Sequence, residues 1–213
     1  MRIDVFTLVP HAYAWLTEQR PVANVLGGEL ELRLFNYRDS TPLRAGQVDD
    51  VPYGGGAGMV LRVDVVAAAL EAAYSAEPPG PVIALTPKGR QLTQPVVEKF
   101  AALPALTLLS SRFEGFDERI VEHLATDAIS VGPYVLSNGD LPAMLVLDAV
   151  ARRLPGALAE GSGELESFSK ELGGGLEYPH YTRPADFNGW LVPEVLLSGD
   201  HARVDAWRRE QVR

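Results

Sequence analysis

The stretch Val48–Val60, VDDVPYGGGAGMV, sets two adjacent carboxylates beside four glycines that fall within five residues. Glycine loses more backbone freedom on ordering than any other residue, so such a loop is costly to hold in one conformation. Bare backbone lets a ligand approach closely, and Asp49 and Asp50 could offer oxygens to a cation such as Mg²⁺. Taken alone, the stretch is equally typical of a glycine-rich surface turn.

Three further segments combine glycine with polar residues directly after an apolar run. In a parallel sheet, ligands bind where the loops leave the carboxyl ends of the strands. We therefore expect these three segments to form one pocket. They are Leu85–Arg90 (LTPKGR), Ser110–Arg119 (SSRFEGFDER) and Ile129–Ala143 (ISVGPYVLSNGDLPA).

The familiar nucleotide-binding and hydrolase motifs do not fit this chain. Its glycines do not follow the dinucleotide spacing, and no Gly-Lys-Ser/Thr follows a glycine-rich loop. Ser137, Asp140 and His123 could be combined as a hydrolase triad, but no nucleophile elbow surrounds any serine. The four histidines are scattered without metal-site spacing, so no metal ligand is assigned.

The elements that must position these loops alternate between short β-rich runs and segments of helical spacing. That order predicts an α/β fold with a mainly parallel sheet, and continuous apolar runs such as Val82–Leu85 suit a sheet covered on both faces. The expected strands are 1–9, 30–38, 81–87, 105–111 and 128–131, and the expected helices lie near 12–26, 63–76, 94–102, 117–124 and 141–154.

The composition changes near residue 155, where glycine, serine and glutamate replace the strand and helix pattern. Such a stretch is typical of a mobile linker. We expect a main domain over residues 1–157, a linker over 158–178, and a short helical part over 179–213 that ends in a basic helix at 200–213.

The overall composition is that of an ordinary globular chain, with 46% hydrophobic and 22% charged residues. Cysteine is absent, and Arg2 and Asp4 interrupt the first apolar run, so the start predicts a strand rather than a signal peptide. No run is long enough to span a membrane, and a cytoplasmic location is expected. The net charge of −9 argues against indiscriminate coating of nucleic acid but allows a local basic patch.

At these loops the chain resembles the bacterial tRNA (guanine-N1)-methyltransferases of the TrmD type, members of the knotted SPOUT class. The resemblance covers the whole chain, because the matching stretches occur in family order from start to end. It implies a SPOUT-type trefoil-knotted parallel sheet flanked by helices, with a short C-terminal helical appendage, and a homodimer with a composite active site. The stretches are VDDVPYGGGAGM, LTPKGR, RFEGFDER, VGPYVLSNGDLPA, LPGAL, YPHYTRP and VPEVLLSGDHARVDAWRRE.

The resemblance also implies the chemistry. S-adenosylmethionine would donate a methyl group to N1 of the guanosine 3′ of the anticodon in tRNA, with Mg²⁺ as a suggested requirement. The glycine loop would lie beside the donor and the target base, so that Asp50, Tyr53, Gly54, Gly55 and Gly58 bind the acceptor. The donor would contact Leu85, Thr86, Ser111, Glu114, Val131, Gly132, Tyr134, Leu136 and Gly139.

Two residues receive catalytic roles from the resemblance. Glu166, in LESF, would be the base for the guanine N–H proton, and Arg152 would stabilise negative charge on the guanine O6. Judged from the residues alone, Glu166 is typical of a solvated linker acid. Arg152, like Arg153, is typical of a cation favoured at a helix C-terminus.

The chain departs from the family pattern inside the proposed site, and it ends within what the family has as a longer C-terminal helical domain. These departures keep two alternatives open beside tRNA methylation. One is a diverged relative that methylates another RNA or a small guanine-like molecule, and the other is a non-catalytic RNA-binding knot protein. The departures are Ala45 for His, Ser111 for Gly, Phe113 for Tyr, Pro133 for Asp, Asn138 for Gly, Asp140 for Glu and Glu166 for Asp.

Overall fold

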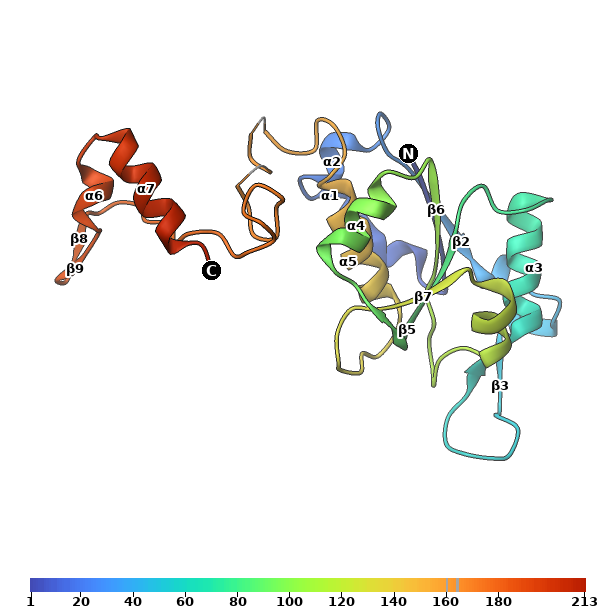
Figure 1. Ribbon diagram of the computed structural model, residues 1–213. Helices are drawn as coiled ribbons and strands as arrows, with labels where there is room; N and C mark the ends of the chain where they lie inside the picture. Colours follow the sequence, from blue (N-terminus) through green and yellow to red (C-terminus); the bar gives the residue numbers. More distant parts are fainter. Residues whose placement is uncertain (160, 164) are drawn as a thin grey trace. The chain divides into compact units, whose positions relative to one another are not determined.

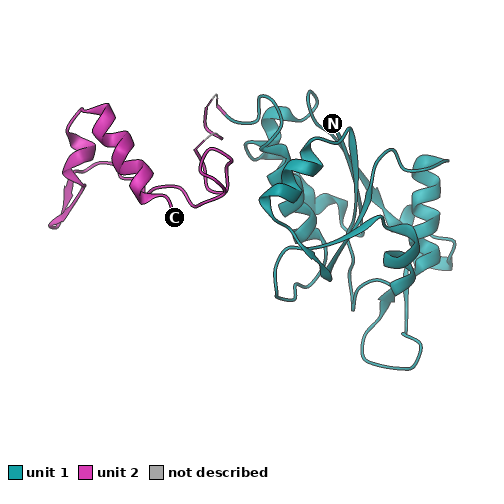
Figure 2. Ribbon diagram, in the orientation of Figure 1, with its two compact units in different colours: residues 1–158 teal, residues 159–213 magenta. Residues whose placement is uncertain are grey.

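The computed structural model describes residues 1–159, 161–163 and 165–213. The chain divides into two compact units, Met1–Leu158 and Ala159–Arg213, which are coloured separately in Figure 2.

The first unit is built on a five-stranded sheet in the order β2-β1-β6-β5-β7, in which every pair of neighbours is parallel. All five residues of β6 are buried, as expected for the central strand of a sheet covered on both faces. The predicted α/β class with a parallel sheet is confirmed. The strands are β1 (Arg2–Thr7), β2 (Glu31–Asn36), β5 (Val82–Gln91), β6 (Ala105–Leu109) and β7 (Asp127–Ser130).

Helices cover both faces of this sheet (Figure 1). Side chains of β1 alternate between the faces: Ile3 and Val5 join one hydrophobic cluster, whereas Phe6 joins the other. The first cluster includes α1 (Ala14–Glu18), α2 (Val22–Val25), α4 (Gln94–Ala101) and α5 (Asp140–Ala151), and the second includes α3 (Val63–Tyr74) and the π-helical turn Ile120–Leu124.

Three expected elements differ in the structure. The expected helix near 12–26 is a 3₁₀ turn, Pro10–Tyr13, followed by α1 and α2, because Pro21 lacks the N–H that would continue one helix. The expected helix near 117–124 reduces to the π-helical turn. Leu85–Arg90, expected as a loop, belongs to β5, with a register shift between Leu85 and Arg90.

The glycine loop is the tip of a small hairpin that sequence reasoning did not predict. Its strands are β3 (Asp49–Asp50) and β4 (Val60–Leu61), which pair antiparallel. The four glycines between them all have φ between 78° and 134°, a region that other residues rarely adopt. The glycines are therefore required by the backbone path of the loop.

The second unit begins with turns and ends in a hairpin and two helices. The strands β8 (Asp186–Phe187) and β9 (Trp190–Leu191) pair antiparallel, and α6 (Glu194–Leu197) and α7 (His201–Gln211) follow. The expected basic helix is confirmed as α7, where the Asp200 side chain caps the first turn by accepting from Arg203 N. Among the described residues of both units, no helix has the length and apolar character needed to cross a membrane.

Candidate active site

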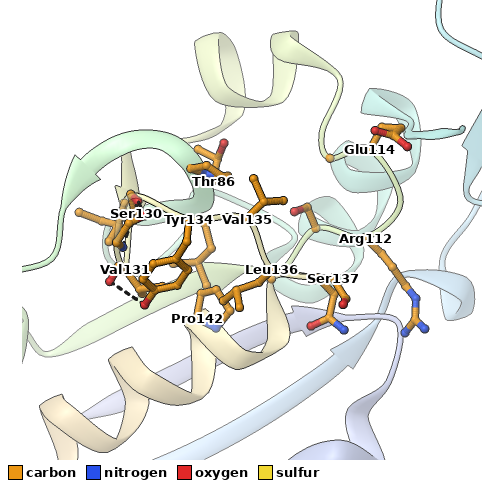
Figure 3. Close-up of a pocket in the computed structure, with 18 of the residues that line it drawn as sticks. Thr86, Arg112, Glu114, Ser130, Val131, Tyr134, Val135, Leu136, Ser137 and Pro142 are labelled. Carbon is orange, nitrogen blue, oxygen red and sulfur yellow. Dashed lines mark hydrogen bonds between the residues drawn. The ribbon is translucent and has the colours of Figure 1, made fainter. Parts of the chain in front are cut away.

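A cavity of about 140 Å³ lies at the carboxyl ends of β5, β6 and β7. Its lining comes from the three segments expected to form one pocket: residues 85–87, 111–115, and 129–132 with 134–139 and Pro142 of α5. The segments meet because parallel strands end at the same edge of the sheet. Figure 3 shows side chains from all three segments around this cavity.

The structure brings together the residues expected to contact the methyl donor. Every one of the nine lines this cavity: Leu85, Thr86, Ser111, Glu114, Val131, Gly132, Tyr134, Leu136 and Gly139. Tyr134 folds back over its own loop, and its hydroxyl donates to the carbonyl oxygen of Val131 at 3.2 Å (Figure 3).

Two glycines let the backbone itself form the walls. A Cβ on Gly139 would lie 2.6 Å from the nitrogen of Ser111, and the Gly139 N–H donates to the carbonyl oxygen of Ser111 at 2.7 Å. A Cβ on Gly132 would overlap the ring of Tyr134. The cavity thus combines close-packed main chain with apolar side chains, a surface suited to a flat, partly polar ligand.

The glycine loop is tied to the cavity through Glu114. The Glu114 N–H donates to the carbonyl oxygen of Met59 at 2.9 Å, and the Leu61 N–H donates to Gly115 at 3.0 Å. Gly58 lies so close to the Glu114 carboxylate that a Cβ would overlap it. The expected acceptor-binding loop and the expected donor-binding loop are therefore neighbours within one chain.

The other expected acceptor-binding residues spread along the hairpin. The ring of Tyr53 is fully exposed, and Gly54 and Gly55 have open space where a Cβ would be. Asp50 is held at the base of the loop by Arg62, whose Nη1 lies 2.9 Å from Asp50 Oδ2.

Arg62 also binds Asp64, with 2.8 Å between Nη2 and Oδ2. This hydrogen bond lowers the pKa of Asp64. The described residues contain no group of three His, Asp or Glu side chains arranged to hold a metal ion. With Asp50 engaged by arginine, the residues here do not fit a resident Mg²⁺ site.

Neither of the two expected catalytic residues is among the residues that line the cavity. Arg152 is the C-cap of the 12-residue α5, so about 18 Å of helix separates it from Gly139 at the other end. Burial raises the pKa of Asp148, and the nearby Arg152 offsets part of that shift. Glu166 belongs to the second unit, where its carbonyl oxygen accepts from Ser169 N at 3.0 Å.

Sequence reasoning missed the contacts of Asp140, which it considered for a hydrolase triad and as a departure from the family glutamate. The buried Asp140 Oδ1 accepts from the hydroxyls of Thr7, Tyr13 and Ser110. His123 instead lies 3.8 Å from Glu122. The triad hypothesis is therefore wrong, and no sequence signal linked Asp140 to residues more than 120 positions earlier.

The parallel sheet and its backbone-walled cavity define an α/β domain with a candidate ligand cavity at the carboxyl edge of its strands. The chain belongs to the family described as tRNA (Guanine-1)-methyltransferase TrmD, which matches residues 1–213. The resemblance inferred from the motifs is thereby confirmed.

Curated relatives agree with this membership. A tRNA (guanine-N(1)-)-methyltransferase of Dehalococcoides mccartyi is 47% identical over 214 residues, covering 99% of this chain and 85% of the relative. That of Gloeobacter violaceus is 48% identical, covering 99% and 92%. That of Rhizorhabdus wittichii is 51% identical over 172 residues, covering 80% and 69%. All three relatives are named as methyltransferases, so they do not support the alternative of a non-catalytic RNA-binding knot protein.

Proposed function

We infer that this chain is a tRNA (guanine-N1)-methyltransferase, which transfers a methyl group from S-adenosylmethionine to N1 of the guanosine 3′ of the anticodon. Family membership over the whole chain supports the reaction class. The structural observation that carries the proposal is that all nine expected donor-binding residues surround one cavity, beside the glycine loop.

The cavity fits the methyl donor by its chemistry. Leu85, Val131 and Leu136 supply apolar walls for an adenosyl group, and neighbouring backbone groups can meet its polar edges. Glu114 brings a carboxylate toward a ligand that carries positive charge. When bound, S-adenosylmethionine supplies an electrophilic methyl group on its sulfonium centre.

The glycine loop is the proposed platform for the acceptor base. Gly54 and Gly55 leave the backbone bare, so that a flat base can approach without meeting side chains. Tyr53 exposes its whole ring and can stack on a nucleobase, a contact worth roughly 1–3 kcal/mol per base. Arg62 holds the base of this platform through Asp50.

Glu166 and Arg152 are the proposed catalytic residues. As N1 of guanine gains the methyl group it loses its proton, and the carboxylate of Glu166 would accept that proton. Arg152 would stabilise the negative charge that develops on O6, which calls for a fixed cation. Both roles depend on these side chains reaching a cavity that neither of them lines.

A homodimer would meet this requirement. A single stripe of α5, ending at its C-cap, carries four residues at helical spacing: Leu141, Leu145, Asp148 and Arg152. Leu141 is 53% exposed and Leu145 is 50% exposed. A second copy packed on this stripe would bury the leucines and bring its own Arg152 toward the site. We therefore propose a composite site in which one subunit binds the donor and its partner supplies the catalytic side chains.

Mixing two inactive variants tests the composite site. Gly139→Ala should weaken donor binding, and Glu166→Gln should disable the base, so each homodimer should have little activity when S-adenosylmethionine is kept well below the Kd of the Gly139→Ala variant. A mixed dimer holds one intact composite site and should recover up to about half of its sites. Mixtures no more active than the separate variants, once exchange of subunits is verified, would contradict the composite site.

The path of the chain supports a trefoil knot. From β7, at the edge of the sheet, the chain returns to α5. The start of this helix is bonded to the ends of two inner strands: its N-cap Gly139 to Ser111 after β6, and its first residue Asp140 to Thr7 in β1. Pulling the two ends apart in a force experiment should give an unfolded length shorter than the full chain allows at ~3.3–3.6 Å per residue. A full-length extension would contradict the knot.

A labelled-methyl transfer assay with several acceptors tests the proposed function. Unmodified tRNA with guanosine 3′ of the anticodon should accept methyl groups, whereas the same tRNA with adenosine there should not. Free guanine nucleotides and unrelated RNA serve as competing acceptors, since a diverged relative would prefer one of them. A preference for either over tRNA would overturn the assignment. We propose a cytoplasmic location, where the tRNA substrate would be found.

A further inference from the structure

A buried polar cluster lies next to the donor cavity and has no part in the chemistry proposed above. Its centre is Asp140, the first residue of α5, which is 4% exposed. Its Oδ1 accepts from Thr7 Oγ1 at 2.5 Å, Ser110 Oγ at 2.9 Å and the Tyr13 hydroxyl at 3.1 Å. The donors come from β1, from the residue after β6 and from the 3₁₀ turn, so one carboxylate ties three elements to α5.

The surroundings favour a fixed arrangement of this cluster. A buried carboxylate without hydrogen-bond donors is strongly unfavourable, so the three hydroxyls and Asp140 depend on one another. Burial, and secondarily the charge of Asp140, raise the pKa of Tyr13 and of Tyr37. Tyr13 therefore keeps its proton and remains a donor over the whole physiological range.

The cluster is connected to the cavity through the main chain. Ser110 precedes Ser111, and Gly139 precedes Asp140; both Ser111 and Gly139 line the cavity. Asn138, a third lining residue, accepts from the Asp140 N–H through its Oδ1 at 3.0 Å. A shift of Asp140 therefore displaces lining residues of two segments, the one after β6 and the one before α5, although Asp140 itself lies outside the lining.

We propose that Asp140 is a positioning residue for the methyl-donor site. It clamps the segment after β6 to the N-terminus of α5, so that the walls of the cavity are in place before the ligand arrives. A preformed wall lowers the ordering cost of binding. The inference rests on the proposed function, because it assigns S-adenosylmethionine to this cavity.

The chain contains a matched control in a second buried carboxylate cluster. Asp4 is 1% exposed and accepts from the Tyr74 hydroxyl at 2.8 Å, and that hydroxyl lies 2.6 Å from Thr107 Oγ1. These three residues lie outside the cavity lining. Removing a hydroxyl here disturbs a similar buried network without a connection to the donor site.

The test compares donor affinity with thermal stability in Asp140→Asn, Ser110→Ala and the control Tyr74→Phe. Affinity for S-adenosylmethionine and its demethylated product is measured by titration calorimetry below the unfolding transition. Asp140→Asn and Ser110→Ala should each raise the donor Kd by about tenfold, as loss of a hydrogen bond to a charged group predicts. Tyr74→Phe should lower the unfolding temperature but change the donor Kd less than about twofold.

The outcomes separate this inference from the function on which it rests. Donor binding unchanged in both Asp140→Asn and Ser110→Ala would overturn the positioning role alone. An equal loss of affinity in Tyr74→Phe would also overturn it, because general destabilisation would then explain the effect. Failure of the unaltered chain to bind either ligand would overturn the proposed function as well. Ser110→Ala keeps the Asp140 carboxylate in place. If Asp140→Asn does not fold, the donor Kd of Ser110→Ala alone therefore tests the positioning role.

Discussion

Replacing Gly139 with alanine should block the donor cavity by a purely steric effect. The backbone of Gly139 has φ −83° and ψ −2°, which alanine adopts without strain. The added Cβ would lie 2.6 Å from Ser111 N and 3.0 Å from Ser110 Cα. The closer distance is 0.8 Å short of the 3.4 Å at which ordinary contact begins. Because both neighbours are backbone atoms, the segment after β6 must move.

The size of the effect follows from that movement. Forcing an extra methyl group into a packed site costs about 1–3 kcal/mol. If the displaced segment must return for the donor to bind, the same energy appears as a loss of affinity of roughly 5- to 150-fold. Titration calorimetry with S-adenosylmethionine measures this loss directly, and thermal unfolding should show a lower transition temperature.

Gly28→Ala is the matched control for this prediction. Gly28 has no positive φ, and a Cβ there meets only Val25 O, at 3.8 Å. It should leave both donor affinity and stability close to those of the unaltered chain. Donor affinity in Gly139→Ala equal to that in Gly28→Ala would show that the cavity at Gly139 is not where the donor binds.

Other substitutions test separate parts of the proposal. Glu166→Gln should lower turnover by roughly 10²–10⁴-fold and leave donor affinity unchanged, as single-turnover kinetics and calorimetry would show; near-normal turnover would exclude Glu166 as the base. Arg62→Met should release Asp50 and raise the KM for tRNA more than the donor Kd, so equal changes in both would argue against a role in placing the acceptor. Burial raises the pKa of Asp148 in the folded state above its value in the unfolded chain. The protonated carboxyl therefore favours folding at pH values below the unfolded-state pKa, and this contribution to stability is lost as the pH rises through the folded-state pKa. Asp148→Asn should therefore raise the unfolding temperature near pH 7 and have little effect near pH 3. A higher unfolding temperature near pH 3 alone would show that the pKa of Asp148 is not raised by folding.

The sheet and the pocket could be predicted from the sequence because their signals are local. Apolar runs such as Leu106–Leu109 indicate buried strands, and parallel strands necessarily deliver the loops that follow them to one edge. The split of the first helix at Pro21 was also readable from proline chemistry, although the expected range ran through it. The β3–β4 hairpin has only two residues in each strand, which is too short to show a period of two.

The Asp140 cluster lay beyond sequence reasoning for a different reason. Asp140 is separated from Thr7 by 133 positions and from Tyr13 by 127, and no periodic pattern links residues that far apart. Only the tertiary path, which returns the chain from β7 toward β1 and β6, brings them together. The proposed composite site could not be worked out from residue patterns either, because it would depend on contacts with a second copy of the chain.

The most direct test of the central claim is to locate the transferred methyl group. Unmodified tRNA with guanosine 3′ of the anticodon is incubated with the enzyme and S-adenosylmethionine, digested to nucleosides and fragments, and analysed by mass spectrometry. The account predicts 1-methylguanosine at that single position, and none when adenosine replaces the guanosine. Methylation at another atom or nucleotide, or no transfer to tRNA by a chain that binds the donor, would contradict it.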